Sequence, residues 1–154
     1  HGGANEEVMH MMNKIKKPEN ALKWINSALK NKEVVMGFGH RVYKSGDSRV
    51  PTMREYFGKV AKIKKDKKFE KIYDIVEKVM IDRKNIHPNV DYPTGPTYHL
   101  MGFDTDFFTP IFVISRITGW SAHVLEQLST NKLIRPLAAY NGSKHRHVSE
   151  LKNR

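Results

Sequence analysis

Apolar residues recur at intervals of three and four along most of the chain, and this helical period constrains the fold more than any other feature. A helix is expected wherever the period persists, and two of these helices should carry a proline in their first turn, at Pro18 and Pro110. The expected helices cover residues 4–15, 18–29, about 51–63, 69–80 and about 109–128. The alternation of apolar and polar residues that marks half-buried strands is nearly absent. The sequence therefore predicts an all-α fold.

The composition supports a packed core and excludes several kinds of site. Of the 154 residues, 39% are hydrophobic and none is cysteine. Without cysteine there are no disulfides and no thiolate metal ligands, which fits a reducing compartment, so we expect a cytoplasmic protein. No spacing of the HExxH type is present, and no metal site is expected. The longest apolar run, residues 107–122, is interrupted by Pro110 and Arg116 and predicts a buried helix rather than a bilayer span.

The net charge of +11 would suit nucleic acid, an anionic membrane surface or phosphorylated metabolites as partners. The densest basic run, "KIKKDKKFEK" at residues 62–71, has acidic residues within it and around it. Such interleaving is typical of a solvated helix face. A basic helical module that binds nucleic acid is therefore the less favoured alternative, since it would need a single basic face.

The stretch "GFGHRVYKSGDSR", residues 37–49, combines a glycine-spaced turn with several basic side chains. Gly37 and Gly39 allow the backbone to turn tightly and let another group approach it closely. His40 and Arg49 follow them and could meet a phosphate or a carboxylate. The pattern indicates a small anionic ligand, and a solvated basic loop is the alternative.

Asp91 lies in "NIHPNVDYPTGP", residues 85–96, where three prolines and a glycine predict an irregular connection between helices. An acid in such a connection is either a turn or helix-capping residue, or a carboxylate held beside a substrate as a general base. His1 and His40 each neighbour a glycine, which suggests hydrogen-bond donors aimed at a ligand, and a structural or solvent-facing role is the alternative.

Arg116 is the only formal charge between Phe107 and Ala122. Burying a guanidinium costs several kcal/mol unless an anion meets it. Arg116 is therefore expected either to pair with a buried acid of the protein or to bind a substrate carboxylate through its planar fork.

Several ordered motifs extend along the chain: "HGGANEEV" at residues 1–8, "GFGHRVYK" at 37–44, Asp-x-Arg at 47–49, "HPNVD" at 87–91, "FVISR" at 112–116 and "IRP" at 134–136. In this order they resemble the C-terminal portion of the citrate synthase family. The stretches "GDSRVPTM" and "DYPTGPTYHLMGFDTDFFTP" are most similar to bacterial 2-methylcitrate synthases. The resemblance implies a multi-helical citrate synthase-like fold, with the small CoA-binding domain at residues 1–104 and the C-terminal part of the large domain at 105–154.

The resemblance also implies three catalytic residues. His1 matches the histidine that donates a hydrogen bond to the thioester carbonyl of the acyl-CoA. Asp91 matches the base that removes the α-proton. His40 matches the histidine that polarises the ketone of oxaloacetate and protonates the new alkoxide.

Binding residues follow in the same way. The family's carboxylate-binding arginines match Arg49, Arg116 and Arg135, the last of which reaches across from the partner in a homodimer. The backbone that recognises the CoA adenine matches Val35, Met36, Gly37, Phe38 and Gly39.

An enzyme of this kind joins propionyl-CoA, and also acetyl-CoA, to oxaloacetate, giving 2-methylcitrate or citrate and free CoA. The CoA thioester is a substrate, and no tightly bound cofactor, nucleic acid or membrane partner is implied. Chains of the family are much longer than 154 residues, so this sequence is expected to begin within the protein and to be inactive alone. The alternatives are an ordinary citrate synthase that prefers acetyl-CoA and a catalytically inactive interaction fragment.

Overall fold

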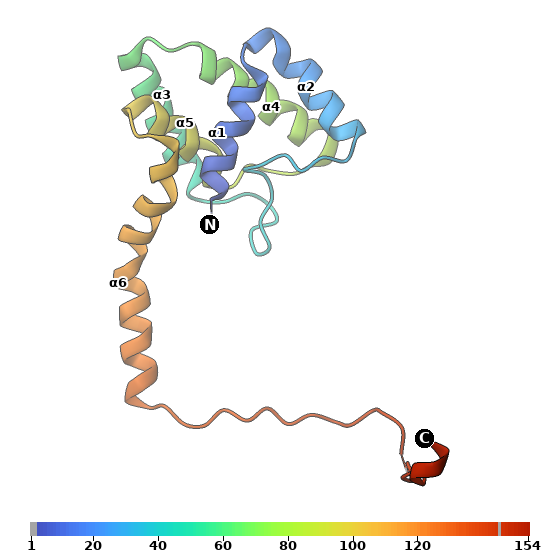
Figure 1. Cartoon of the computed structure of the whole chain (residues 1–154). Coiled ribbons are helices and arrows are strands. Elements are labelled where there is room, and N and C mark those ends of the chain that lie inside the picture. The colour runs from blue at the N-terminus through green and yellow to red at the C-terminus, as the bar shows by residue number, and fades with distance from the viewer. Residues whose placement is uncertain (1–2, 145) are drawn as a thin grey trace. The chain divides into compact units, whose positions relative to one another are not determined.

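The computed structural model of the chain describes residues 3–144 and 146–154 and is helical, which confirms the predicted all-α class (Figure 1). The α-helices are α1 (Ala4–Ile15), α2 (Pro18–Lys30), α3 (Val50–Lys64), α4 (Lys68–Lys84), α5 (Asp91–Met101) and α6 (Phe108–Ser129). Two short 3₁₀ helices are η1 (Thr105–Phe107) and η2 (Leu151–Asn153). In the described part of the chain, the β-type pairing is a single isolated bridge between Phe38 and Pro88.

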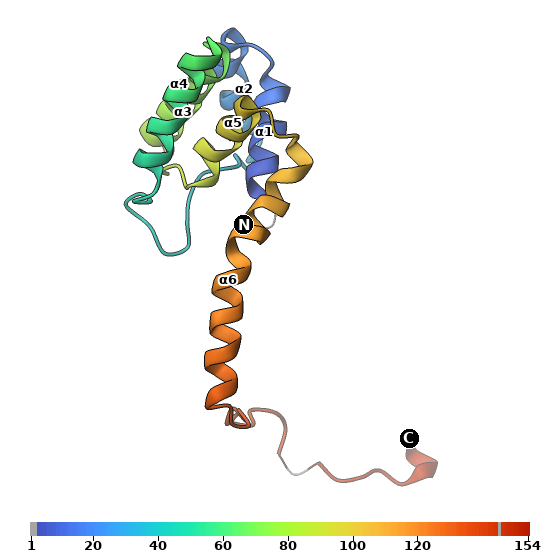
Figure 2. The same cartoon turned by 90° about the vertical axis from the view of Figure 1, so that its left-hand side faces the viewer.

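The chain divides into two compact units, His1–Thr118 and Gly119–Arg154. Within the first unit, α1 packs on α5, α2 packs on α4, and α3 packs on α5 (Figure 2). The second unit contains the end of α6 and the segment that follows it, whose described residues are exposed. All of the packed core therefore belongs to the first unit.

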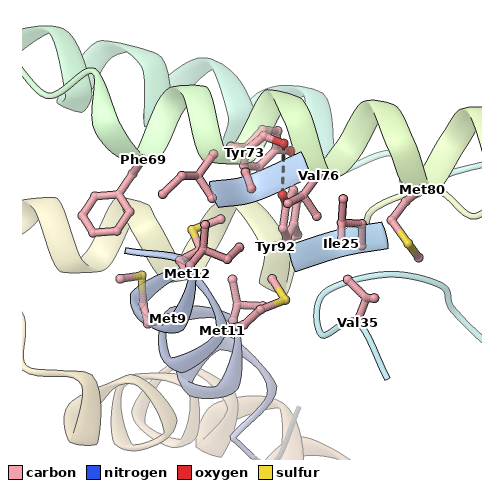
Figure 3. Close-up of a cluster of buried hydrophobic side chains, with 14 of the residues drawn as sticks. Met9, Met11, Met12, Ile25, Val35, Phe69, Tyr73, Val76, Met80 and Tyr92 are labelled. Atoms are coloured by element: carbon pink, nitrogen blue, oxygen red, sulfur yellow. Dashed lines mark hydrogen bonds between the residues drawn. The ribbon is translucent and has the colours of Figure 1, made fainter. Parts of the chain in front are cut away.

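The centre of the core is built from methionines of α1 and aromatic residues of α4 and α5 (Figure 3). Tyr73 and Tyr92 are both fully buried, and their ring centroids lie 4.3 Å apart. The Tyr92 hydroxyl donates a hydrogen bond of 3.0 Å to the Tyr73 backbone carbonyl. Because a buried phenol is stable only when its hydroxyl has a partner, this bond fixes the start of α5 against α4.

The first four expected helices are confirmed, with their bounds shifted by a few residues at most ends. In α4 the six apolar residues that recur at spacings of three and four are all buried: Phe69, Ile72, Tyr73, Val76, Val79 and Met80. In α2 the apolar residues Leu22, Ile25, Ala28 and Leu29 recur at helical spacing and would be expected to form the buried face, but Leu22 is 51% exposed and Ala21 is buried instead. The buried stripe of α2 is Ala21, Ile25 and Ala28, at helical spacings of four and three.

The prediction of an irregular connection over residues 85–96 is wrong in its second half, because α5 begins at Asp91. Pro93 is the third residue of α5, where a backbone N–H has no partner within the helix anyway. Pro96 removes one helical hydrogen bond and would disfavour an isolated helix. However, α5 is buried at every residue from Asp91 to Thr97, and tertiary packing on α1 and α3 outweighs the local preference.

The prediction that the apolar run near residues 107–122 forms a buried helix is also wrong for this chain. The helix is present as α6, but Phe108 is its only buried residue. Ile117 and Trp120 are 49% and 44% exposed. Among the described residues, no helix has the length and apolarity needed to cross a membrane.

Candidate active site

Two segments far apart in the sequence lie side by side in the first unit: residues 37–39, between α2 and α3, and residues 87–89, between α4 and α5. The Gly37 carbonyl accepts a hydrogen bond of 2.8 Å from the Asn89 N–H, and the Gly39 N–H donates one of 2.9 Å to the His87 carbonyl. We call this the 37–39/87–89 pairing. His40 follows one paired segment and Asp91 begins just after the other, so the pairing brings together two of the predicted site regions.

Gly37 is required at its position by both conformation and space. Its φ is +86°, and a Cβ built there would lie 2.8 Å from the Cβ of Tyr92. The close neighbour of this position is the first turn of α5, which packs directly on the Gly37 backbone.

Asp91 is the first residue of α5 and is only 7% exposed. It lines a cavity of about 190 Å³ together with Arg49, Asn5, Thr94 and other residues of the first unit. Burial raises the pKa of the Asp91 carboxyl, the nearby Asp47 raises it as well, and the charges of Arg49 and His40 oppose this. A carboxylate with a raised pKa is a stronger base, and its position in a cavity suits proton removal from a bound substrate.

Arg49 is held by Asp47, an acid of the Asp-x-Arg motif for which the sequence predicted no role of its own. The Asp47 carboxylate accepts a hydrogen bond of 2.9 Å from Arg49 Nε and one of 2.7 Å from Arg49 Nη2. This bidentate pair lowers the pKa of Asp47 to about 2, and the Asp47 side chain is 1% exposed. A guanidinium has a second edge, formed by Nη1 and Nη2, so an arginine fixed in this way can still bind another carboxylate. The Asp-x-Arg spacing was the available signal for this pair.

His40 has a defined acceptor on one side of its ring. Its Nδ1 accepts hydrogen bonds from the backbone N–H groups of Val42, at 3.0 Å, and Tyr43, at 3.2 Å. In the neutral imidazole the proton is therefore on Nε2, which can donate a hydrogen bond to a ligand. The ring stacks on Tyr43 with centroids 4.4 Å apart and lines a different cavity, of about 220 Å³, from the one that contains Asp91.

Arg116 differs from its expected setting. It is exposed, and its guanidinium lies 4.8 Å from the centroid of the Phe112 ring, which also lines the Asp91 cavity. No ion pair between Arg116 and an acid occurs in the described residues, so the alternative of a buried internal pair is wrong for this chain.

The remaining predicted residues have different outcomes. Arg135 is exposed in the second unit, and His1 lies outside the described residues. Val35 and Phe38 line a cavity of about 330 Å³, whose other lining residues include Lys32 and Lys84. In the described parts of the chain, no group of three or more histidines and acids could hold a metal ion.

Comparison with known proteins identifies the family. Residues 1–137 match the family described as citrate synthase, C-terminal domain. The chain belongs to the citrate synthase family. Over all 154 residues it is 54% identical to 2-methylcitrate synthase 2 of Corynebacterium glutamicum, and it spans 40% of the length of that relative. Over 148 residues, 96% of the chain, it is 53% identical to the citrate synthase of Mycolicibacterium smegmatis and again spans 40% of the relative.

Solved structures of citrate synthases have the same fold as this citrate synthase family chain. One is the ternary complex of citrate synthase from the thermophilic archaeon Thermoplasma acidophilum with carboxymethyl coenzyme A and oxaloacetate. It matches with a TM-score of 0.80 and 36% identity, covering 100% of this chain and 42% of the other. The citrate synthase of Thermotoga maritima matches with a TM-score of 0.78 and 35% identity, covering 100% of this chain and 43% of the other. The predicted family and the citrate synthase-like fold are therefore confirmed.

Proposed function

We propose that this chain forms part of a cytoplasmic condensing enzyme that joins propionyl-CoA, and also acetyl-CoA, to oxaloacetate. The observation that carries the proposal is the shared cavity of Asp91 and Arg49, which combines a base of raised pKa with a carboxylate-binding group. The 54% identity to a 2-methylcitrate synthase over the whole chain supports the choice of substrates.

Asp91 acts as the base in this reaction. The α-C–H of a thioester is a very weak acid, and an aspartate of ordinary pKa is a poor base for it. Proton removal becomes feasible when a preorganised donor meets the oxygen of the developing enolate, the role proposed for His1. The burial that raises the pKa of Asp91 makes the carboxylate more basic and so favours the same step.

The nucleophilic carbon then attacks the ketone carbon of oxaloacetate, and a carbon–carbon bond forms. The proposed donor to the ketone is the Nε2–H of His40, which protonates the alkoxide that results. Arg49, Arg116 and Arg135 bind the carboxylates of oxaloacetate, with Arg135 supplied by the second subunit of a homodimer. Hydrolysis of the new thioester breaks its carbon–sulfur bond, releases CoA and makes the overall reaction effectively irreversible.

Coenzyme A is bound as a substrate rather than as a resident cofactor. The backbone of Val35, Met36, Gly37, Phe38 and Gly39 is proposed to recognise the adenine. Val35 and Phe38 also form part of the apolar wall of the 330 Å³ cavity, which a planar base could occupy. The residues of this backbone belong to a proposed small domain, residues 1–104, that closes on the large domain to which residues 105–154 contribute.

The chain spans 40% of the length of the relatives named above, and we propose that it is inactive without the remainder of such an enzyme. The experiment is a thiol-release assay with oxaloacetate and either acyl-CoA, on the full-length protein that contains this chain. Release with a higher kcat/KM for propionyl-CoA is the expected result. Absence of thiol release with both thioesters would overturn the proposed function.

An ordinary citrate synthase is the second candidate, because the Mycolicibacterium smegmatis relative of that name is 53% identical, almost the same as the 2-methylcitrate synthase. The two substrates differ by one methylene, and a pocket discriminates such a difference by about 1–3 kcal/mol. A higher kcat/KM for acetyl-CoA in the same assay would favour this candidate.

A further inference from the structure

Asn89 makes contacts on both sides of the 37–39/87–89 pairing. Its side-chain Nδ2 donates a hydrogen bond of 3.0 Å to the carbonyl of Gly39, the residue before His40. Its side-chain Oδ1 accepts a hydrogen bond of 3.0 Å from the N–H of Asp91. One amide group therefore bridges the backbone beside His40 and the backbone of Asp91.

The chemistry of these two contacts fixes the residue type. A carbonyl on one side needs a donor, and an N–H on the other side needs an acceptor, and the primary amide of asparagine supplies both at a short reach. Rotating the amide by half a turn would place its oxygen against the Gly39 carbonyl and its nitrogen against the Asp91 N–H, and neither contact could then be a hydrogen bond. The network therefore determines which atom is the nitrogen and which is the oxygen. The Asn89 backbone makes two further hydrogen bonds. Its N–H donates to the Gly37 carbonyl, at 2.8 Å, and its carbonyl accepts from the Tyr92 N–H, at 3.1 Å.

We propose that Asn89 is a positioning residue that sets the separation between the base Asp91 and the ketone donor His40. This inference rests on the proposed function, because it takes its two reacting groups from there. Asp91 lines one cavity and His40 another, and the side-chain bridge through Asn89 is a short covalent and hydrogen-bonded path between them. Condensation requires the carbon deprotonated at Asp91 to reach the ketone held at His40, so a shift of either backbone slows the step.

The test compares two substitutions of Asn89 in the full-length protein that contains this chain. In Asn89→Ala both side-chain contacts are lost, and kcat should fall by about 100-fold, as for a displacement of about 1 Å, while KM for oxaloacetate changes little. In Asn89→Ser the hydroxyl can still accept the Asp91 N–H, as serine does at helix N-termini, but it is too short to reach the Gly39 carbonyl. Asn89→Ser should therefore recover the melting temperature but not kcat.

Asn20→Ala is the matched control, because Asn20 Nδ2 donates a hydrogen bond of the same length, 3.0 Å, to the Ile15 carbonyl between α1 and α2. It should lower the melting temperature and leave kcat unchanged. The positioning role is wrong if Asn89→Ala has the kcat of Asn20→Ala, or if Asn89→Ser recovers kcat together with the melting temperature. If Asn89→Ala does not fold, the kcat of Asn89→Ser alone decides. A failure of the proposed function is distinguishable, because the unmodified protein would then release no thiol.

Discussion

Replacing Gly37 by alanine should destabilise the protein more than a positive φ alone would. The φ of +86° disfavours any residue with a Cβ by about 1–2 kcal/mol. The new methyl group would also lie 2.8 Å from two side-chain atoms of Tyr92 and 2.9 Å from its Cα. Tyr92 cannot withdraw, because it is fully buried and its hydroxyl is bonded to the Tyr73 carbonyl. Overpacking of this kind adds about 1–3 kcal/mol, so the expected loss is about 2–5 kcal/mol.

Gly102→Ala provides the control for the conformational part. The φ of Gly102 is +95°, close to that of Gly37, and no atom lies within 4 Å of the Cβ that would be added. Gly102→Ala should therefore lower the free energy of unfolding by about 1–2 kcal/mol. The free energy of unfolding of both variants would be measured by urea titration, with the slopes compared to verify two-state behaviour. Equal losses for the two variants would refute the argument that Tyr92 excludes a side chain at Gly37.

Three further predictions concern the charged residues of the site. Asp91→Asn should lower kcat by about 10²–10⁴-fold in the thiol-release assay and leave oxaloacetate binding by calorimetry intact, whereas nearly unchanged turnover would exclude Asp91 as the base. The pKa of Asp47 is about 2 in the folded protein, whereas the ordinary pKa of an aspartate is 3.8. The ion pair with Arg49 therefore stabilises the folded state fully above about pH 4, and this stabilisation is lost as the pH falls towards 2. Because the Arg49 side chain is 42% exposed and its charge is partly screened by solvent, we expect the pair to contribute about 1–2 kcal/mol to the free energy of unfolding. Asp47→Asn should remove this part of the acid dependence of the melting temperature, and an unaltered acid dependence would count against the pair. Arg116→Lys should weaken oxaloacetate binding by about tenfold or more, since an ammonium cannot reproduce the bidentate fork, with the apo melting temperature little changed because Arg116 is exposed; a collapsed melting temperature with normal binding would mean a structural role.

The helices with one long apolar face could be predicted from the sequence. In α4 the face extends from Phe69 to Met80, and a pattern of that length outweighs single exceptions. The helix α5 could not be predicted, because the internal Pro96 argues against a helix locally and the stability of α5 comes from burial against α1 and α3. The exposure of α6 could not be predicted either. An apolar run indicates that a helix has a surface suited to packing, but not whether this chain contains the segment that covers that surface.

Candidate site residues could be proposed from the sequence where a residue type alone indicates chemistry, as for His40, Arg49 and Asp91. The residues that hold these groups could not. Asp47 could have been a solvated loop acid, and only its burial against Arg49 reveals its role. Asn89 has one partner two residues away and another 50 residues away, and no local pattern contains the second.

The distance along the chain between Asn89 and Gly39 also constrains the order of folding. Closing a flexible loop of 50 residues is entropically unfavourable, although each doubling of length adds only about 0.6 kcal/mol. Between them lie α3 and α4, which are connected by residues 65–67 and joined by the 2.8 Å ion pair of Arg54 with Asp74. If this α3–α4 pair forms first, it shortens the loop that remains to be closed, and we expect the paired segments to dock late. Substitutions of Gly37 or Asn89 should therefore accelerate unfolding more than they slow folding, whereas substitutions between α3 and α4 should slow folding itself.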